Sequence, residues 1–178
     1  MSDAPTDAAE PVLQLYPDRD WCALHTRARH EKKVAGVCQG LHVPCYLPLR
    51  LHRTFSGGKV NTFRVPIFPG YVFAALAAGE VSELKRTNSI AQRIETRNQE
   101  GLLRDLGNVL RVERAQVELE ASPILTEGQR VLVTRGPLAG VTGLVRRHKN
   151  RHRLQVVVEA IQQALLLDVD RDDLIPVT

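Results

Sequence analysis

Hydrophobic and polar residues alternate differently in the two halves of the chain. An amphipathic helix is predicted from about His30 to Leu41, because apolar residues recur there every three or four positions and share one face. Val43-Pro44 ends it, since a residue before proline avoids the α region. A second helix of the same kind is predicted from Gln99 to Arg114. The first half therefore contains helices as well as strands.

Strand periodicity fills the rest of the first half. Strands are predicted at residues 21–26, 45–55, 60–65, 71–76 and 89–95, with a short helix at 80–86. Ser56-Gly57-Gly58-Lys59 joins the second and third strands into a long hairpin, whose basic residues indicate an arm reaching away from the core. The order β-α-β-β-β-α-β-α predicts an α+β sandwich, with helices packed on a mainly antiparallel sheet.

The second half shows strand periodicity only. After a polar stretch containing Ser122-Pro123, short apolar runs at 128–134, 143–147, 154–158 and 164–169 are separated by glycine-rich turns. This pattern favours a small SH3-like β-barrel. Residues 1–17 carry three prolines and no periodicity, as in a flexible tail. The predicted plan is a tail at 1–17, the sandwich at 18–114, a linker at 115–124 and the barrel at 125–178.

Composition permits a nucleic-acid partner without requiring one. The 178 residues carry a net charge of +4, a sequence pI of about 9.2 and 43% hydrophobic residues. No stretch approaches the roughly 18 apolar residues of a membrane span, and the acidic start lacks the features of a signal peptide. We therefore expect a cytoplasmic protein with no membrane contact.

Catalytic and metal-binding patterns are weak. The sequence has no phosphate-binding glycine loop, HExxH motif or nucleophile elbow, so neither an enzyme nor a cofactor is expected. Cys38, His42 and Cys45 lie close together in sequence but lack paired CxxC spacing, and thiols are favoured over a zinc site. Asp168, Asp170 and the aspartates after them are better explained as a solvated edge than as a metal cluster.

The densest aromatic segment is Phe68-Pro69-Gly70-Tyr71-Val72-Phe73. Phe68 lies between two prolines and has a stiff backbone, Gly70 allows a turn, and Tyr71 and Phe73 share one face of a strand. A rigid apolar patch of this kind is typical of interaction hot spots. For any single aromatic residue, a place in the core is an equally good explanation.

These residues resemble the NusG family of transcription elongation factors. The first domain resembles the NusG N-terminal domain through Trp21, the helix after it and Pro66–Phe73. The second is similar to a KOW motif at Glu127–Val133 and Gly136–Val145. The resemblance implies a monomer that binds the clamp of RNA polymerase and suppresses pausing or termination. It implies polymerase contacts at Phe68, Pro69, Tyr71, Phe73, Arg86 and Thr87.

Two basic clusters are candidate nucleic-acid sites, for non-template DNA or nascent RNA. One lies at the junction between the first strand and the first helix, and the other lies in the second domain. Their members are Arg27, Arg29, Lys32 and Lys33, and Arg146, Arg147, Lys149 and Arg151. A solvated surface is the alternative explanation for both.

The chain departs from the family in the second domain. NusG proteins carry an aromatic–glycine pair in the turn that corresponds to Glu159–Ala164, and both residues are missing here. That puts contact with termination factor Rho or a ribosomal protein in doubt and favours a specialised antiterminator like RfaH. Good helix formers at 159–167 also suggest that this domain could form a helical hairpin over the polymerase-binding patch. The alternative function is a KOW-type ribosome or RNA-binding structural protein.

Overall fold

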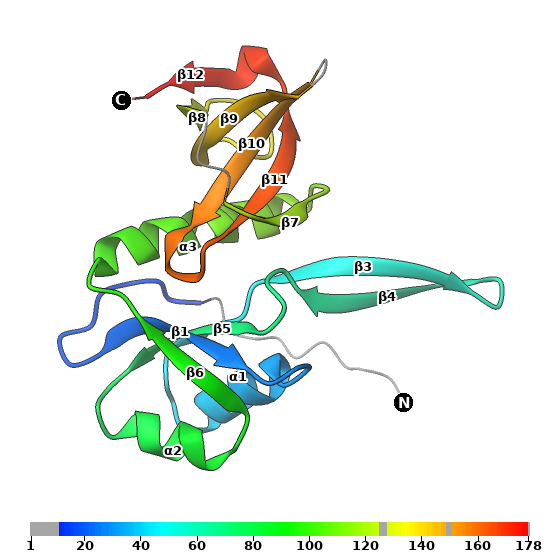
Figure 1. Ribbon diagram of the computed structural model, residues 1–178. Helices are drawn as coiled ribbons and strands as arrows, with labels where there is room; N and C mark the ends of the chain where they lie inside the picture. Colours follow the sequence, from blue (N-terminus) through cyan, green and yellow to red (C-terminus); the bar gives the residue numbers. More distant parts are fainter. Residues whose placement is uncertain (1–10, 125–127, 149–150, 178) are drawn as a thin grey trace.

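The computed structural model describes residues 11–124, 128–148 and 151–177 (Figure 1). Its first sheet is antiparallel, with the strand order β2-β5-β1-β6. These strands are β1 (Asp20–Thr26), β2 (Cys45–Tyr46), β5 (Tyr71–Leu76) and β6 (Ile90–Glu95). β1 and β5 are central and buried, which explains their nearly continuous apolar sequences.

Three helices cover this sheet from both sides. α1 (Glu31–Gly40) and α2 (Glu80–Arg86) lie on one face and α3 (Gln99–Ala115) on the other (Figure 1). Alternate residues divide accordingly: Cys22 and Leu24 join the cluster with α1 and α2, whereas Trp21 and Phe73 join the cluster with α3. The predicted α+β arrangement of helices on an antiparallel sheet is confirmed.

A long hairpin forms a separate two-stranded sheet. Its strands, β3 (Leu49–Ser56) and β4 (Lys59–Pro66), pair along their full length and extend away from the rest of the molecule (Figure 1). Residues 45–55 were predicted as one strand, but the chain divides at Leu47-Pro48 into β2 and β3. Proline has no N–H to donate, and the interruption lets β2 stay in the first sheet while β3 leaves it.

The second half forms a six-stranded antiparallel sheet in the order β12-β8-β9-β10-β11-β7. Its strands are β7 (Glu120–Pro123), β8 (Gln129–Val133), β9 (Thr142–His148), β10 (Arg151–Val158), β11 (Gln163–Val169) and β12 (Leu174–Pro176). Within the described ranges no pairing joins β7 to β12, so a closed barrel stays a prediction. β7 lies inside the predicted linker; the domain boundaries themselves remain a prediction.

Residues 159–167 do not form the helical hairpin that their helix propensity suggested. Glu159–Ile161 is a single 3₁₀ turn, η1, and the chain continues directly into β11. Ala164, Leu165 and Leu167 are buried in the sheet, and this burial outweighs the small propensity differences. A second 3₁₀ turn, η2 (Arg171–Asp173), precedes β12.

α3 joins the two halves. Asn108 on this helix donates from Nδ2 to Thr142 Oγ1 at 3.0 Å and accepts from the Thr142 N–H at 3.3 Å. The Glu159 N–H at η1 donates to Asp105 Oδ2 at 3.1 Å, and η1 also lies against β1 and β6. A single hydrophobic cluster runs from Trp21 and Phe73 through α3 to the strands of the second sheet.

The described part of the predicted tail packs against this cluster. Gln14 O accepts a 2.7 Å hydrogen bond from Trp21 Nε1, and the ring of Tyr16 lies 6.5 Å from that of Trp21. Residues 1–10 lie outside the described residues. No helix in the described ranges is long and apolar enough to span a bilayer.

Candidate functional site

The aromatic motif has a buried part and an accessible part. Phe68 and Phe73 are 1% and 0% exposed, and their rings meet edge to face with centroids 6.5 Å apart. Pro69 is exposed and Tyr71 is half-buried. Of the four residues in this motif predicted to contact RNA polymerase, Pro69 and Tyr71 are therefore accessible in this structure, and the two phenylalanines are packed in the core because they face α3.

The turn between Phe68 and Tyr71 is held from two neighbouring elements. Glu31 Oε1 at the start of α1 accepts a 2.7 Å hydrogen bond from the Gly70 N–H, while Gly70 O accepts one of 2.8 Å from Thr26. His25 stacks on Tyr71 at a centroid distance of 5.1 Å. Gly70 has φ 85°, a left-handed conformation that glycine adopts without strain. The accessible ring and proline are thus fixed in place.

Glu31 and His25 were missed as site residues by sequence reasoning. Glu31 is only 7% exposed although it is charged and lies in the first turn of a helix. An acidic residue there is ordinary on a helix, because it complements the helix dipole. No sequence signal links it to Gly70, which lies 39 residues later.

Arg86 and Thr87, predicted as a second polymerase contact, end α2. Arg86 is exposed and forms an ion pair of 3.6 Å with Glu83. The Thr87 hydroxyl donates to Leu84 O at 2.7 Å and accepts from the Ser89 N–H at 3.3 Å. Thr87 therefore shapes the end of the helix, and Arg86 supplies the accessible charge.

The first basic cluster is exposed and adjoins the end of α2. Arg27 Nη2 donates to Asn88 Oδ1 at 2.8 Å, and the Arg27 N–H donates to Ser89 O at the same distance. Arg29 has φ 63°, and this left-handed residue turns the chain into α1, where Lys32 and Lys33 are exposed. The structure therefore brings two separately predicted segments, the Arg27 cluster and the Arg86–Thr87 segment, onto neighbouring positions.

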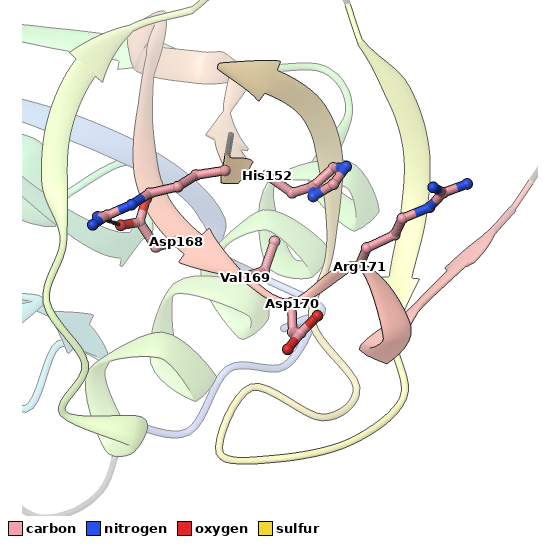
Figure 2. Close-up of a pocket in the computed structure, with 6 residues that line it drawn as sticks. His152, Asp168, Val169, Asp170 and Arg171 are labelled. Atoms are coloured by element: carbon pink, nitrogen blue, oxygen red, sulfur yellow. Dashed lines mark hydrogen bonds and ion pairs between the residues drawn. The ribbon is translucent and has the colours of Figure 1, made fainter. Parts of the chain in front are cut away.

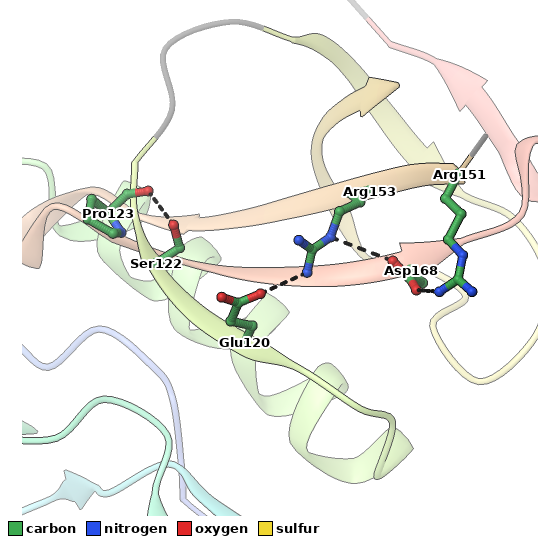
Figure 3. Close-up of polar contacts among 6 residues, drawn as sticks. All are labelled: Glu120, Ser122, Pro123, Arg151, Arg153 and Asp168. Atoms are coloured by element: carbon green, nitrogen blue, oxygen red, sulfur yellow. Dashed lines mark hydrogen bonds and ion pairs between the residues drawn. The ribbon is translucent and has the colours of Figure 1, made fainter. Parts of the chain in front are cut away.

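The second basic cluster is partly neutralised by acids on adjacent strands (Figure 3). Arg151 lies 2.9 Å from Asp168. Arg153, two residues further along β10, lies 3.1 Å from Glu120 and 3.6 Å from Asp168. Arg147 is exposed, whereas Arg146 is half-buried and engaged in further interactions. Lys149 lies outside the described residues. Arg146, Arg147 and Arg151 lie along β9 and β10, and Arg151 is paired with Asp168, so fewer charges of this cluster are free than the sequence suggested.

A surface pocket of about 420 Å³ lies beside this cluster (Figure 2). Its lining mixes both charges and one apolar side chain: Arg151, His152, Asp168, Val169, Asp170 and Arg171. Across residues 11–124, 128–148 and 151–177, no three His, Cys, Asp or Glu side chains gather closely enough to hold a metal ion. Asp168 is instead occupied by the two arginines.

The cysteines are free thiols around one core cluster. Cys22 and Cys38 are buried in it, and Cys45 packs against it. Burial raises the pKa of Cys22. A hydrogen bond with Cys45, together with burial, raises the pKa of Cys38, and the same hydrogen bond lowers the pKa of Cys45. Cys22 and Cys38 therefore act as small hydrophobic residues.

Residues 19–118 match the family described as "Transcription termination factor nusG". The chain belongs to the NusG family. This matched region contains the first sheet, the hairpin and all three helices, so NusG membership places the chain among transcription elongation factors. β8 to β12 lie beyond the match, so the KOW assignment stays a prediction.

Two solved structures are distantly similar to this NusG-family chain. One is titled "Crystal Structure of MjSpt4:Spt5 complex conformation B", with 18% identity, a TM-score of 0.30, and coverage of 89% of this chain and 97% of that chain. Conformation A of the same complex has 18% identity, a TM-score of 0.28, and coverage of 89% and 98%. Similarity at this level does not establish a shared arrangement. No curated protein matches the chain.

Proposed function

We propose that this NusG-family chain binds RNA polymerase through its first domain and suppresses pausing or termination. The observation that carries the proposal is the rigid turn that presents Pro69 and Tyr71 above an aromatic core. Its backbone is fixed by Glu31 and Thr26, and its ring is fixed by His25. Aromatic side chains held in one conformation lose little entropy on binding, which makes them effective anchors.

The neighbouring charges supply further contacts in this proposal. In the family the aromatic patch docks on the polymerase clamp, and Arg86 with Thr87 would meet the opposite side of the polymerase cleft. Contact with both sides would favour the closed, processive state by population shift. Arg27, Arg29, Lys32 and Lys33 are exposed close by, where phosphates of non-template DNA could be neutralised.

The second domain supports assignment to an RfaH-like specialised antiterminator. The turn that carries the aromatic–glycine pair in NusG proteins is here η1, which lies against α3, β1 and β6. Ile161 in that turn is 6% exposed and belongs to the continuous core cluster. A turn engaged within the chain is poorly placed to recruit Rho or a ribosomal protein, so neither contact is part of the proposal.

A binding measurement with purified core RNA polymerase tests the first step. Tyr71→Ala in the full chain should weaken binding on the order of thirtyfold, as expected for loss of an interface anchor. Tyr16→Ala removes a tyrosine that is also half-buried but packs against Trp21 rather than against the turn, and it should bind like the wild type. Equal binding by both variants would reject the Tyr71 surface.

Two further readouts separate docking from folding and from the alternative function. Thermal unfolding of Tyr71→Ala shows whether the fold is retained, and Tyr71→Phe, which keeps the ring, should restore most of the binding. Single-round transcription with the wild type should show shorter pauses, and Tyr71→Ala should not shorten them. Recovery of ribosomal RNA without polymerase, unaffected by Tyr71→Ala, would instead support the ribosome or RNA-binding alternative.

A further inference from the structure

The β3–β4 hairpin, here called the arm, has no partner within the described chain that covers its faces. It forms its own two-stranded sheet and extends beyond both larger sheets (Figure 1). At its root the Leu49 N–H donates to Glu113 Oε1 of α3 at 3.1 Å, and just below the paired strands the Ile67 N–H donates to Pro48 O at 2.8 Å. An isolated two-stranded sheet is marginally stable in water, so its bare faces call for an explanation.

The charge of the arm is entirely positive. Residues 49–66 include Arg50, Arg53, Lys59 and Arg64 but no Asp or Glu. All four cations are exposed, and none forms an ion pair with the described residues. Two arginines of the second sheet, Arg151 and Arg153, differ in this respect, since both are paired with acids. The arm therefore presents charges that a polyanion would neutralise.

The arm also carries much of the exposed apolar surface. Among the described residues eight large hydrophobic side chains are exposed, and four of them belong to the arm. They are Phe55 at 76%, Val60 at 64%, Phe63 at 49% and Leu51 at 43%. Basic residues alone would protect the edges of a two-stranded sheet from pairing with other chains. Edge protection explains the basic residues but leaves the exposed Phe55 and Phe63 unexplained.

The strand register distributes these residues over both faces. Phe55 lies opposite Val60 and Leu51 opposite Arg64, so one face holds these four together with Arg53. The other face holds Phe63 opposite His52, with Arg50 and Lys59. Each face thus combines a phenyl ring with two cations.

This distribution distinguishes among possible partners. A membrane-bound element keeps its cations off its apolar face, whereas Arg53 and Arg64 lie among the apolar residues on one face of the arm, and the other face carries a second phenyl ring. A second copy of the chain would bring like charges together, which disfavours association through the arm. Single-stranded nucleic acid fits both features, because unstacked bases stack on aromatic rings while arginine and lysine track the phosphates.

We propose that the arm is a binding site for single-stranded nucleic acid, with little dependence on base sequence. Phe55 and Phe63 stack on bases, and Arg50, Arg53, Lys59 and Arg64 contact phosphates. The site is distinct from the Arg27 cluster, and it requires no binding to RNA polymerase. DNA and RNA share the chemistry that the arm recognises, so the experiment must distinguish them.

Fluorescence anisotropy tests the proposal on the full chain with labelled single-stranded DNA and RNA of about 12 nucleotides, within the range of known site sizes. Phe55→Ala/Phe63→Ala should weaken binding at least tenfold, given the usual effect of losing base stacking. Arg53→Gln/Arg64→Gln should lower the slope of log K against log salt by about 1.4, since each phosphate contact on a single strand contributes about 0.7. Comparison of the DNA and RNA affinities shows which of the two nucleic acids the arm binds more tightly.

The matched control is Arg97→Gln/Arg135→Gln, which removes two exposed arginines outside the arm and should leave affinity and slope close to the wild type. Thermal unfolding verifies that all variants fold, and the arm residues are exposed enough for this to be expected. The proposal is overturned if arm and control variants bind alike. Tight binding only to duplex DNA or to anionic lipid vesicles would overturn it too. Tyr71→Ala should keep its oligonucleotide affinity, which separates this proposal from polymerase binding.

Discussion

Two neighbouring segments contain all four phenylalanines of the chain, and the side chains are buried in one segment and exposed in the other. Phe68 and Phe73 are buried, whereas Phe55 and Phe63, in the arm immediately before them, are 76% and 49% exposed. Both segments have strand periodicity and apolar residues. The difference arises from what covers each strand: β5 lies between α3 and the pair α1 and α2, while β3 and β4 have only each other. Burial here is decided by neighbours, not by the local sequence.

The largest difference between the two segments is expected when one phenyl ring is removed from each. Phe73→Ala should lower the free energy of unfolding by about 3–5 kcal/mol, because it removes a fully buried ring and leaves a cavity. Phe55→Ala should change it by less than about 0.5 kcal/mol, as at other exposed positions. Urea denaturation measures both. Similar losses at the two positions would mean that the arm is packed against something in solution.

A smaller effect is expected at the junction of the two segments. Glu113 on α3 accepts hydrogen bonds from the Tyr46 hydroxyl at 2.6 Å and from the Leu49 N–H at the root of the arm. Glu113→Ala should lower the free energy of unfolding by about 2 kcal/mol, since the buried Tyr46 hydroxyl loses its acceptor. Glu118→Ala, at an exposed position just beyond α3, is the control and should have almost no effect. Urea denaturation measures the loss of stability, and faster hydrogen exchange of the Leu49 N–H reports the loss of its acceptor at the root of the arm. Equal responses of Glu113→Ala and Glu118→Ala would contradict the role of Glu113 in holding the arm.

The smallest effect on stability is expected at Asp105 on α3, the helix that packs on β5. Asp105 accepts a hydrogen bond from the Glu159 N–H at the start of η1. Burial raises the pKa of Asp105, and the Glu159 N–H only partly counteracts it. The folded chain therefore holds this proton more tightly than the unfolded chain. The ionised carboxylate disfavours folding at neutral pH, and this penalty fades as the pH falls through the raised pKa toward the usual value for aspartate.

Asp105→Asn keeps an acceptor oxygen but loses the charge. It should raise the free energy of unfolding at pH 7, and the gain should shrink as the pH is lowered. Urea denaturation at a series of pH values measures this. Asp105→Ala serves as the comparison, because it also removes the acceptor for Glu159 and should gain less. A gain that is independent of pH would show that the Asp105 charge is not responsible.

Much of the fold was predictable because periodicity reports local structure. The short helix at 80–86 and the strand at 71–76 were predicted with the observed boundaries, and α1 and α3 differ from prediction by one residue at each end or less. β12 and β7 were missed. β7 was assigned to the linker because Ser122 and Pro123 are typical of loops, yet an edge strand tolerates proline where no partner needs its N–H.

The site was less predictable, because its geometry depends on contacts between distant residues. The motif at Phe68–Phe73 could be found by its aromatic density, but the alternation shared by Tyr71 and Phe73 could not reveal that only Tyr71 stays accessible. Likewise, the basic run in β9 and β10 gave no sign that Asp168 and Glu120 would lie opposite it. Pairings between strands, rather than residue types, determine which charges are free.

The separateness of the arm has a consequence for how its length can vary. Each residue added to both β3 and β4 would extend its reach by about 3.4 Å without disturbing either core cluster. A single added pair would exchange the two faces for every residue beyond it, whereas two pairs would restore them. Insertions and deletions that preserve the pattern of rings and cations on the arm should therefore come in steps of two residues per strand.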